Sequence, residues 1–369
     1  MRQKLTELCD ILYGFAFDSA GFTEDSTYPP LVRIRDVKRG YSETNYSGDY
    51  QEQYVIHAGD LLIGMDGEFN IARWKSRDAL LNQRVCKISA KEGTEEEYLR
   101  FALSRALREI ENRTAFVTVK HLSAKELNKL ELQVPSLSEQ NRIAITLRRI
   151  EQLIDLRNEE LKKLDELIRA RFVEMFRNMN PSWPTVSIGD ICTDARTGPF
   201  GSALHHDEFV NDGIFVLGID NAVENRFSFN RMRYITEEKY QQLKRYTVYP
   251  GDVIITIMGT VGRSAVIPND MPLAINTKHL ACLTPDYAKV DSIFLCSAFQ
   301  MHPDVQRQLN SNTKGAIMDG LNLGIIKGLE FQLPPLQKQK DFEFFYSQVD
   351  KSKCDALNIT SAPHYLLAS

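Results

Sequence analysis

The residues in this chain that could do chemistry are mainly arginines and lysines, which occur in short clusters beside aromatic and amide side chains. Such cations neutralise phosphates, and arginine also pairs with the edges of bases. The clusters therefore predict a nucleic-acid contact, although a solvated surface charge is the simpler interpretation of any single member. The candidates are Arg33, Arg35, Lys38, Arg39, Arg73, Lys75, Arg77, Arg226, Arg231, Arg233, Arg263, Lys278 and Lys314.

One pair of acidic residues and one pair of histidines could suggest a metal or catalytic site, but neither pair has the further residues that such a site needs. Asp66 and Glu68 could hold magnesium, but Asn70 stands where a nuclease would place a lysine. His205 and His206 are adjacent, so their side chains point in different directions on a helix or a strand. We expect a polar turn at the first pair and a surface loop at the second. No catalytic residue and no metal ligand is predicted in this chain.

Two short motifs resemble parts of enzymes but fit structural roles better. Residues 180–183 (Asn-Pro-Ser-Trp) resemble the Asn-Pro-Pro-aromatic loop that holds a target amino group in DNA methyltransferases, but Ser182 replaces the second proline. The segment is better explained as the end of a helix before a new domain. Gly259 and Gly262 have the wrong spacing for a dinucleotide-binding loop and fit a turn between strands. A self-contained DNA-modifying enzyme is therefore the weakest of the interpretations.

Composition limits the partners of the chain. The 369 residues include 45 basic and 49 acidic side chains, which gives a net charge of −4. A protein that binds nucleic acid over its whole surface should be basic, so this binding mode is excluded. No run of about 18 apolar residues could span a membrane, and the first residues lack the apolar stretch of a secretory signal. Six cysteines without a Cys-x-x-Cys pair are typical of free thiols in a reducing compartment. We expect a cytoplasmic protein that contacts no membrane and whose DNA contacts are local or shared with a partner.

The chain contains an internal repeat. Residues 59–63 (Gly-Asp-Leu-Leu-Ile) recur as 251–255 (Gly-Asp-Val-Ile-Ile), and residues 130–135 (Leu-Glu-Leu-Gln-Val-Pro) recur as 329–334 (Leu-Glu-Phe-Gln-Leu-Pro). After each proline, Leu-x-x-Gln follows, ending at Gln140 and at Gln339. The landmarks keep their order, which indicates a tandem duplication whose loops have diverged.

Each copy begins with short β-like runs separated by glycine and proline turns, then has a helical stretch at 95–111 or 292–309. A short strand ends each copy at the repeated proline. We therefore expect an α+β fold with two tandem β-rich α/β domains. The predicted boundaries are a first domain at 1–136, a helical spacer at 137–180, a second domain at 181–335, and a C-terminal helical region and tail at 336–369.

A heptad pattern follows the first repeated proline and predicts one long helix over residues 138–178. A second helix, from Leu336 to about Cys354, would pair with it as an antiparallel coiled coil, and residues 358–369 look frayed. Two modules held apart by such helices suit two DNA half-sites about one helical turn apart. The seam residues are Ile143, Leu147, Ile150, Ile154, Leu161, Leu164, Ile168 and Met175.

The chain resembles the specificity subunits of type I restriction–modification systems over nearly its whole length. The resemblance rests on the repeated Gly-Asp-hydrophobic box, on the Leu-x-x-Gln tract after each repeated proline, and on three further segments. These are residues 65–71 (Met-Asp-Gly-Glu-Phe-Asn-Ile), 170–176 (Ala-Arg-Phe-Val-Glu-Met-Phe) and 197–202 (Thr-Gly-Pro-Phe-Gly-Ser). One departure is that the short second helix ends without a counterpart to residues 170–176.

The resemblance implies a non-catalytic subunit with two target-recognition domains, each of which reads one half of an asymmetric, two-part DNA sequence. It implies two methyltransferase subunits as partners, which carry S-adenosylmethionine and methylate adenine, with restriction subunits in the full complex. No cofactor is expected on this chain. The alternative that the residues leave open is a duplicated adaptor that binds no DNA and associates through its coiled coil.

Overall fold

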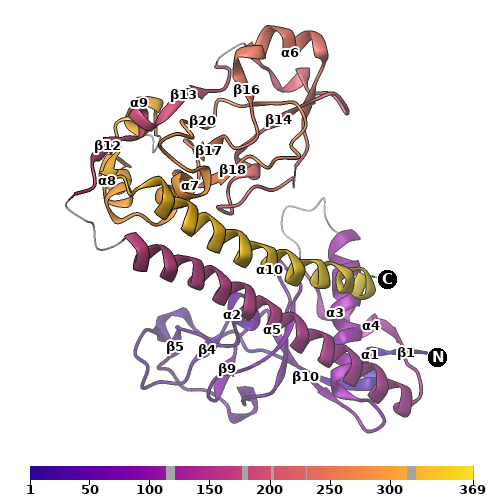
Figure 1. The fold of residues 1–369 in the computed structure, drawn as a ribbon. Helices are drawn as coiled ribbons and strands as arrows, with labels where there is room; N and C mark the ends of the chain where they lie inside the picture. Colours follow the sequence, from indigo (N-terminus) through magenta and orange to yellow (C-terminus); the bar gives the residue numbers. More distant parts are fainter. Residues whose placement is uncertain (114–120, 177–181, 201–202, 230, 314–320, 369) are drawn as a thin grey trace. The chain divides into compact units, whose positions relative to one another are not determined.

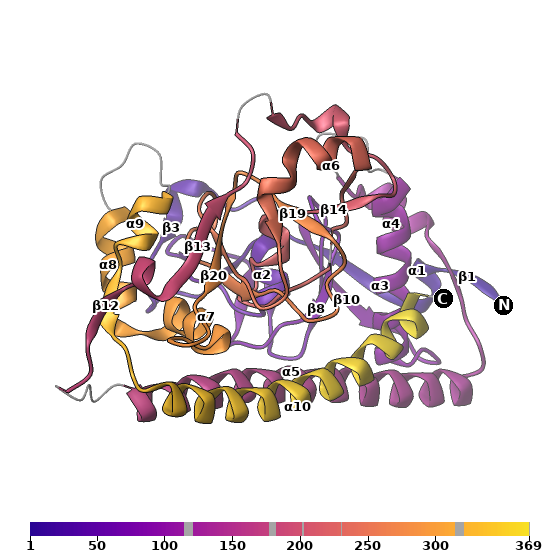
Figure 2. The same ribbon diagram turned by 45° about the horizontal axis from the view of Figure 1, so that its top comes forward.

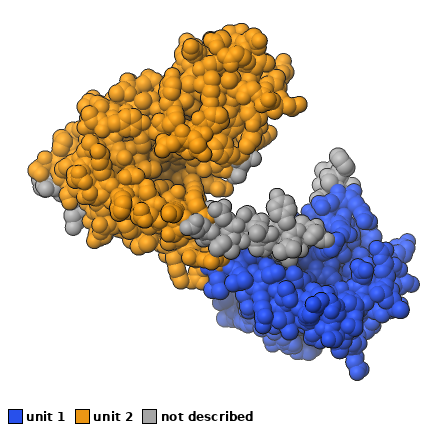
Figure 3. All heavy atoms as spheres, turned by 45° about the vertical axis from the view of Figure 1, so that its right-hand side comes forward, with its two compact units in different colours: residues 1–156 blue, residues 157–369 orange. Residues whose placement is uncertain are grey.

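The computed structural model describes residues 1–113, 121–176, 182–200, 203–229, 231–313 and 321–368, without the side chains of 312–313 and 355–368. The chain forms two compact units, unit 1 (residues 1–156) and unit 2 (residues 157–369), which are coloured separately in Figure 3. Each unit has its own hydrophobic core, so each is described by itself below.

Unit 1 is built on an antiparallel sheet covered by one long helix. The sheet has the order β2 (Cys9–Tyr13), β10 (Val85–Ala90), β7 (Leu61–Gly64) and β8 (Ile71–Arg73). Helix α3 (Glu96–Arg113) buries Leu99, Leu103 and Leu107, which are spaced by four and so share one face. A smaller sheet has the order β4 (Leu31–Val32), β9 (Ala79–Leu81) and β6 (Val55–Ile56).

The remaining elements of unit 1 close its ends and carry its loops. They are β1 (Arg2–Lys4) paired with β11 (Glu131–Gln133), β3 (Phe22–Thr23) paired with β5 (Asn45–Tyr46), α1 (Leu5–Leu8), α2 (Ile34–Arg39) and α4 (Ala124–Lys129).

Unit 2 repeats this plan in the same strand order. Its large sheet is β13 (Cys192–Thr197), β20 (Leu280–Pro285), β17 (Val253–Thr256) and β18 (Ser264–Val266). Its small sheet is β15 (Tyr234–Ile235), β14 (Ile214–Leu217), β19 (Ala274–Asn276) and β16 (Thr247–Val248). Strand β12 (Thr185–Ser187) pairs with β21 (Glu330–Gln332) as β1 pairs with β11. The shared topology supports the duplication inferred from the sequence. The helices are α6 (Glu237–Leu243), α7 (Ser292–Met301), α8 (Pro303–Thr313) and α9 (Leu323–Lys327).

Two long helices follow the repeated prolines, α5 (Leu137–Phe176) and α10 (Leu336–Ala368). Within unit 2 the two helices run side by side (Figures 1 and 2) and are antiparallel. Phe172 packs edge-on against Phe342 with ring centroids 5.3 Å apart, whereas the earlier Asp165 pairs with the later Lys353. The predicted antiparallel pairing is therefore confirmed for this part of the chain.

Three expectations about the helices were wrong. Helix α10 continues to Ala368 instead of ending near Cys354 with a frayed tail, because no glycine follows Cys354 to end it, and its backbone stays helical through Pro363. The stretch at 292–309 is two helices, because the backbone is extended at His302 and Pro303 then occupies the first turn of α8, where a proline is best tolerated. One of the short β-like runs of the first copy covers residues 31–34, but only its first half is a strand: β4 stops at Val32, and helix α2 begins at Ile34.

Candidate nucleic-acid interface

Each unit contains one pair of parallel strands, and all other pairings between its named strands are antiparallel. The parallel pairs are β4 with β9 in unit 1 and β14 with β19 in unit 2. The carboxyl ends of parallel strands meet at one edge, where loops from both strands converge and where ligands commonly bind in open sheets. We call this the carboxyl edge of each unit. Several of the predicted basic residues come directly after the strands that end at this edge.

In unit 1 the carboxyl edge carries the cluster on α2. Asp36, which is 2% exposed, accepts a hydrogen bond from the N–H of Arg33 at 3.0 Å and so fixes the first turn of the helix. The helix ends at Gly40, whose φ of +77° favours glycine. The exposed side chains of α2 are those of Arg35, Lys38 and Arg39. The backbone N–H of Lys75 donates to the carbonyl of Gly40, so its exposed side chain joins the cluster.

Arg84 also lies on this edge, although it is not among the site residues predicted from the sequence. It follows β9 with a left-handed φ of +71°, and its half-exposed guanidinium lies 3.7 Å from Asp66 and contacts His121. Asp66 in turn contacts His121, so the Asp66–Asn70 segment is a polar turn held by a cation, as expected. The signal was available, because Arg84 occupies the position of Lys278 in the repeat.

In unit 2 the corresponding edge combines cations with polar atoms that the protein does not satisfy. Arg233 pairs with Asp220, and its guanidinium lies so close to Gly218 that a side chain there would require the guanidinium to move. Burial, helped by the charges of Lys278 and Arg233, lowers the pKa of His279. At this edge, four of the buried atoms that lack a hydrogen-bond partner in the described part of the chain lie together: Arg233 Nη1, Asn276 Oδ1, Thr277 Oγ1 and His279 Nδ1. Such atoms are costly unless a ligand or water satisfies them.

Three of the predicted DNA-binding arginines are committed to contacts within the protein. Arg73 pairs with Glu96 at 2.6 Å and with Glu97, and it donates to the carbonyl of Gly59. Arg77 donates to the carbonyls of Ser26 and Tyr28, at 2.6 and 2.8 Å. Arg226 contacts Asp350 and the Cys354 sulfur on α10. Their contacts favour a structural role. Arg231, Arg263 and Lys278 are exposed, and Lys314 lies outside the described residues.

Comparison with known proteins identifies the family. Residues 1–166 and 180–359 each match the type I restriction modification DNA specificity domain. The chain is 30% identical over 368 residues to the specificity subunit of the type I restriction enzyme EcoBI from Escherichia coli, covering 92% of this chain and 77% of that one. The chain belongs to the family of type I restriction–modification specificity subunits.

Solved structures agree on the fold. The S subunit of the type I restriction–modification system from M. genitalium superposes with a TM-score of 0.56 at 16% identity, covering 100% of this chain and 93% of that chain. A chain from a structural study of complex assembly and conformational transition of the type I system gives 0.53 at 19%, with 100% and 95% covered. The expected fold, two tandem α+β domains with long helices, is thus confirmed for this specificity subunit.

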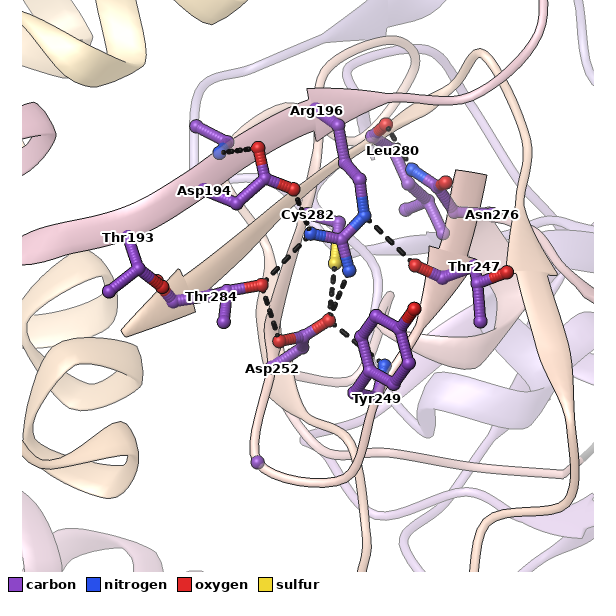
Figure 4. A network of polar contacts seen from close by, with 12 residues as sticks. Thr193, Asp194, Arg196, Thr247, Tyr249, Asp252, Asn276, Leu280, Cys282 and Thr284 are labelled. Carbon is purple, nitrogen blue, oxygen red and sulfur yellow. Dashed lines mark hydrogen bonds and ion pairs between the residues drawn. The ribbon is translucent and has the colours of Figure 1, made fainter. Parts of the chain in front are cut away.

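The Gly-Asp box of the specificity subunit has a structural role. Asp252 is buried and accepts hydrogen bonds from the N–H of Tyr249 at 2.9 Å and from the hydroxyl of Thr284 at 2.8 Å, and it pairs with Arg196 (Figure 4). Gly251 before it has a φ of +83°, which explains why the motif begins with glycine. The box fixes a turn between strands and leaves Asp252 no free oxygen for a ligand.

The predicted seam residues divide between the two units. In unit 2, Ile168 is buried in the core, and Leu164 and Met175 pack against it. Leu161 is half-buried, as are the seam residues that belong to unit 1, Ile143, Leu147, Ile150 and Ile154. The helical face in unit 1 is anchored instead by buried Gln140 and Ala144.

Features that might have indicated other functions have structural explanations. Among the described residues, no group of three or more metal-ligating side chains is assembled, and no helix is long and apolar enough to span a bilayer. His205 is an N-terminal cap residue of a short 3-10 helix that includes His206, and both histidines are exposed. All six cysteines are free, and burial raises the pKa of the Cys9 and Cys192 thiols to about 12. The relatives are specificity subunits, which are not enzymes.

Proposed function

We propose that this specificity subunit reads an asymmetric, two-part DNA sequence, one part at the carboxyl edge of each unit. The observation that carries the proposal is that the two edges share their topology but differ in their side chains. Unit 1 presents a six-residue helix with three exposed cations, whereas unit 2 presents Arg233, Lys278 and His279 on loops. Different side chains on a common scaffold favour different half-sites.

Base contacts in unit 2 are proposed for Arg233, Thr277 and His279, whose side chains are partly exposed at its carboxyl edge. They combine an arginine donor with two groups that can donate or accept, Thr277 and His279. Base edges in the major groove present matching donors and acceptors, whereas a phosphate presents acceptors only. In unit 1 the exposed cations of α2 and Arg84 are proposed to anchor phosphates and bases in the same way.

The partners and cofactors belong to the same proposal. Two methyltransferase subunits would bind the long helices, hold S-adenosylmethionine and methylate adenine in the selected sequence, and restriction subunits would join the full complex in the cytoplasm. This chain would itself hold no cofactor. A net charge of −4 is compatible with DNA binding because the charges at the edges are local and partners can close around the duplex.

Methylation mapping tests the proposal. The chain is co-expressed with a type I methyltransferase subunit, and modified adenines are located by direct long-read sequencing. We expect a split, asymmetric motif that disappears when the chain is omitted. A motif that persists without the chain, or a soluble complex that methylates nothing, would favour the adaptor interpretation.

A further inference from the structure

A polar groove in unit 2 lies where α5 meets the turn between β17 and β18. Its volume is about 490 Å³, and its lining includes Arg169 of α5, Arg263 of the turn, and the amide side chains of Asn225 and Gln300. No aspartate or glutamate lines it among the described residues. The groove therefore concentrates two positive charges without a compensating acid.

Both guanidinium groups in the groove are available to a ligand. Arg169 and Arg263 are exposed, and neither guanidinium has a hydrogen bond or ion pair with a described residue. Other arginines of unit 2 are paired: Arg196 with Asp252, Arg226 with Asp350 and Arg233 with Asp220. Two unpaired cations on one groove favour an anion with more than one acceptor oxygen.

The turn that carries Arg263 is held in place by buried contacts. The hydroxyl of Thr256, which is fully buried, accepts a hydrogen bond from the N–H of Arg263 at 2.9 Å. Gly259 and Gly262 have φ values of +74° and +82°, so the turn brings bare backbone to the groove. Asn225 is fixed in turn, because its amide oxygen accepts from the N–H of Ser264. A fixed site binds an anion with little loss of conformational entropy.

The groove adjoins the carboxyl edge of unit 2. The N–H of Ile257, at the start of the turn, donates to the carbonyl of His279 at 2.9 Å. A side chain at Gly259 would touch Ile219, which follows β14. The groove therefore lies beside the edge at which we placed base contacts.

We propose that this groove binds a backbone phosphate of the DNA held by unit 2, with Arg169 and Arg263 as its two cationic contacts. The inference rests on the proposed function and adds to it a role for α5. The helix between the two domains then contacts DNA directly through Arg169, besides joining the domains. The contact is independent of sequence and positions the duplex on the carboxyl edge.

The test uses the full chain in complex with its methyltransferase subunits and a labelled duplex that carries the mapped target. Arg169→Gln and Arg263→Gln each remove one phosphate contact, so affinity should fall roughly 5- to 20-fold at about 0.15 M salt. The slope of log K against log salt should become shallower by about 0.9 when both arginines are replaced, and by part of that amount in each single variant. Arg169→Lys keeps the charge and should restore most of the slope. Arg148→Gln, on an exposed part of the same helix outside the groove, should bind as the unaltered chain does.

A second arm locates the phosphate. Each phosphate of the second half-site is replaced in turn by a neutral methylphosphonate. One replacement should weaken the unaltered chain more than it weakens Arg169→Gln, which keeps the Arg263 contact, and should leave the double variant Arg169→Gln/Arg263→Gln unaffected, because both contacts to that phosphate are then already lost. The affinity lost should be the same on a duplex whose second half-site has been changed.

Three results would overturn the inference: a salt slope for Arg169→Gln equal to that of Arg148→Gln, a loss restricted to the cognate sequence, or stabilisation by inorganic phosphate that depends on Arg169 while DNA binding does not. Failure of the proposed function is a different result, in which the unaltered complex does not distinguish its mapped target from a scrambled duplex.

Discussion

The two units keep one buried amide unchanged. In unit 1 the Gln140 side chain accepts from the N–H of Glu95 at 2.9 Å and donates to the carbonyls of Gly93 and Pro135. In unit 2, Gln339 accepts from the N–H of Asp291 at 2.9 Å and donates to the carbonyls of Lys289 and Pro334. Both side chains are about 1% exposed or less. A neutral buried group that satisfies three backbone groups at once has no simple substitute.

The charged contacts differ between the units. The acidic residue occupies the same position in both, but the basic residue that pairs with it comes from a different strand. Asp60 of the first Gly-Asp box pairs with Lys87 on β10 at 2.8 Å, whereas Asp252 of the second pairs with Arg196 on β13. Lys87 lies opposite Leu12, and Cys282 lies opposite Arg196 in the equivalent register. The cation has therefore crossed to the neighbouring strand, and an uncharged residue has taken its former place.

A second acid on the long helices repeats this behaviour. Glu151 stands eleven residues after Gln140, and Asp350 stands eleven residues after Gln339. Glu151 pairs with Arg100 of α3 at 2.6 Å, whereas Asp350 pairs with Arg226, which comes from a loop. Neutralising a partly buried carboxylate requires a cation nearby but does not fix the segment that supplies it. Acids and amides thus define the common scaffold, and arginines diverge with the loops.

The largest predicted difference between the units is the cost of removing the Gly-Asp acid. Asp252→Asn leaves Arg196, which is 11% exposed, with only the more exposed Asp194 as its ion-pair partner, and should lower the free energy of unfolding of unit 2 by about 2–3 kcal/mol. Asp60→Asn should cost unit 1 only about 1 kcal/mol, because Lys87 is 22% exposed and water can replace the lost partner. Hydrogen exchange resolved by unit measures both. Equal losses would show that the two networks are energetically alike.

Replacing the buried glutamine that both units share should lower the free energy of unfolding of each unit by the same amount. Gln140→Leu and Gln339→Leu each leave one backbone N–H and two carbonyls without their side-chain partner, for an expected loss of about 2–3 kcal/mol in the unit concerned. Gln337→Leu is the matched control, because that side chain is exposed and bonds only to Asp341 nearby. Losses that differ by more than about 1 kcal/mol would contradict the equivalence of the two sites.

The fate of the arginines shows what the sequence could and could not predict. The duplication, the long helices and their antiparallel pairing were predicted from motif order and periodicity, which are properties of one segment at a time. Arg73 and Arg226 were taken for DNA contacts because neighbouring basic residues suggest a patch. Their partners, Glu97 and Asp350, come from distant segments, and nothing local in the sequence places those acids beside them. Arg169 was not predicted as a site residue, because nothing in the sequence distinguishes it from the other charged residues of its helix.

Moving the cation in unit 1 would sharpen the comparison. Lys87→Cys should destabilise unit 1 by about 1 kcal/mol by leaving Asp60 without its cation. Adding Leu12→Arg should recover most of this loss, because it recreates the arrangement of Arg196 and Cys282 on the adjacent strand. A double-mutant cycle in urea denaturation gives the coupling energy. A loss that Leu12→Arg deepens would mean that unit 1 cannot accept the cation from β2.

The smallest effects concern pH, and they have opposite signs in the two units. Burial alone would raise the pKa of Glu97 in unit 1, but hydrogen bonds from Arg73 and Arg100 more than offset it and lower the pKa below its usual range. Burial raises the pKa of Asp291 in unit 2. The stability that Glu97 contributes is therefore present above its unfolded pKa of about 4.3 and is lost as pH falls through its lower folded value. Protonation of Asp291 favours the folded state, so its contribution improves as pH falls through its raised value.

Glu97→Gln should reduce the stability that unit 1 loses as the pH falls. Asp291→Asn should remove the stability that unit 2 gains over the same change, while keeping the hydrogen bond to the N–H of Phe294. Unit-resolved hydrogen exchange between about pH 3 and 5 separates the two, because these windows surround the ordinary carboxyl pKa values. The same sign of change in both units would show that the charges around the starts of α3 and α7 have not diverged as their cations have.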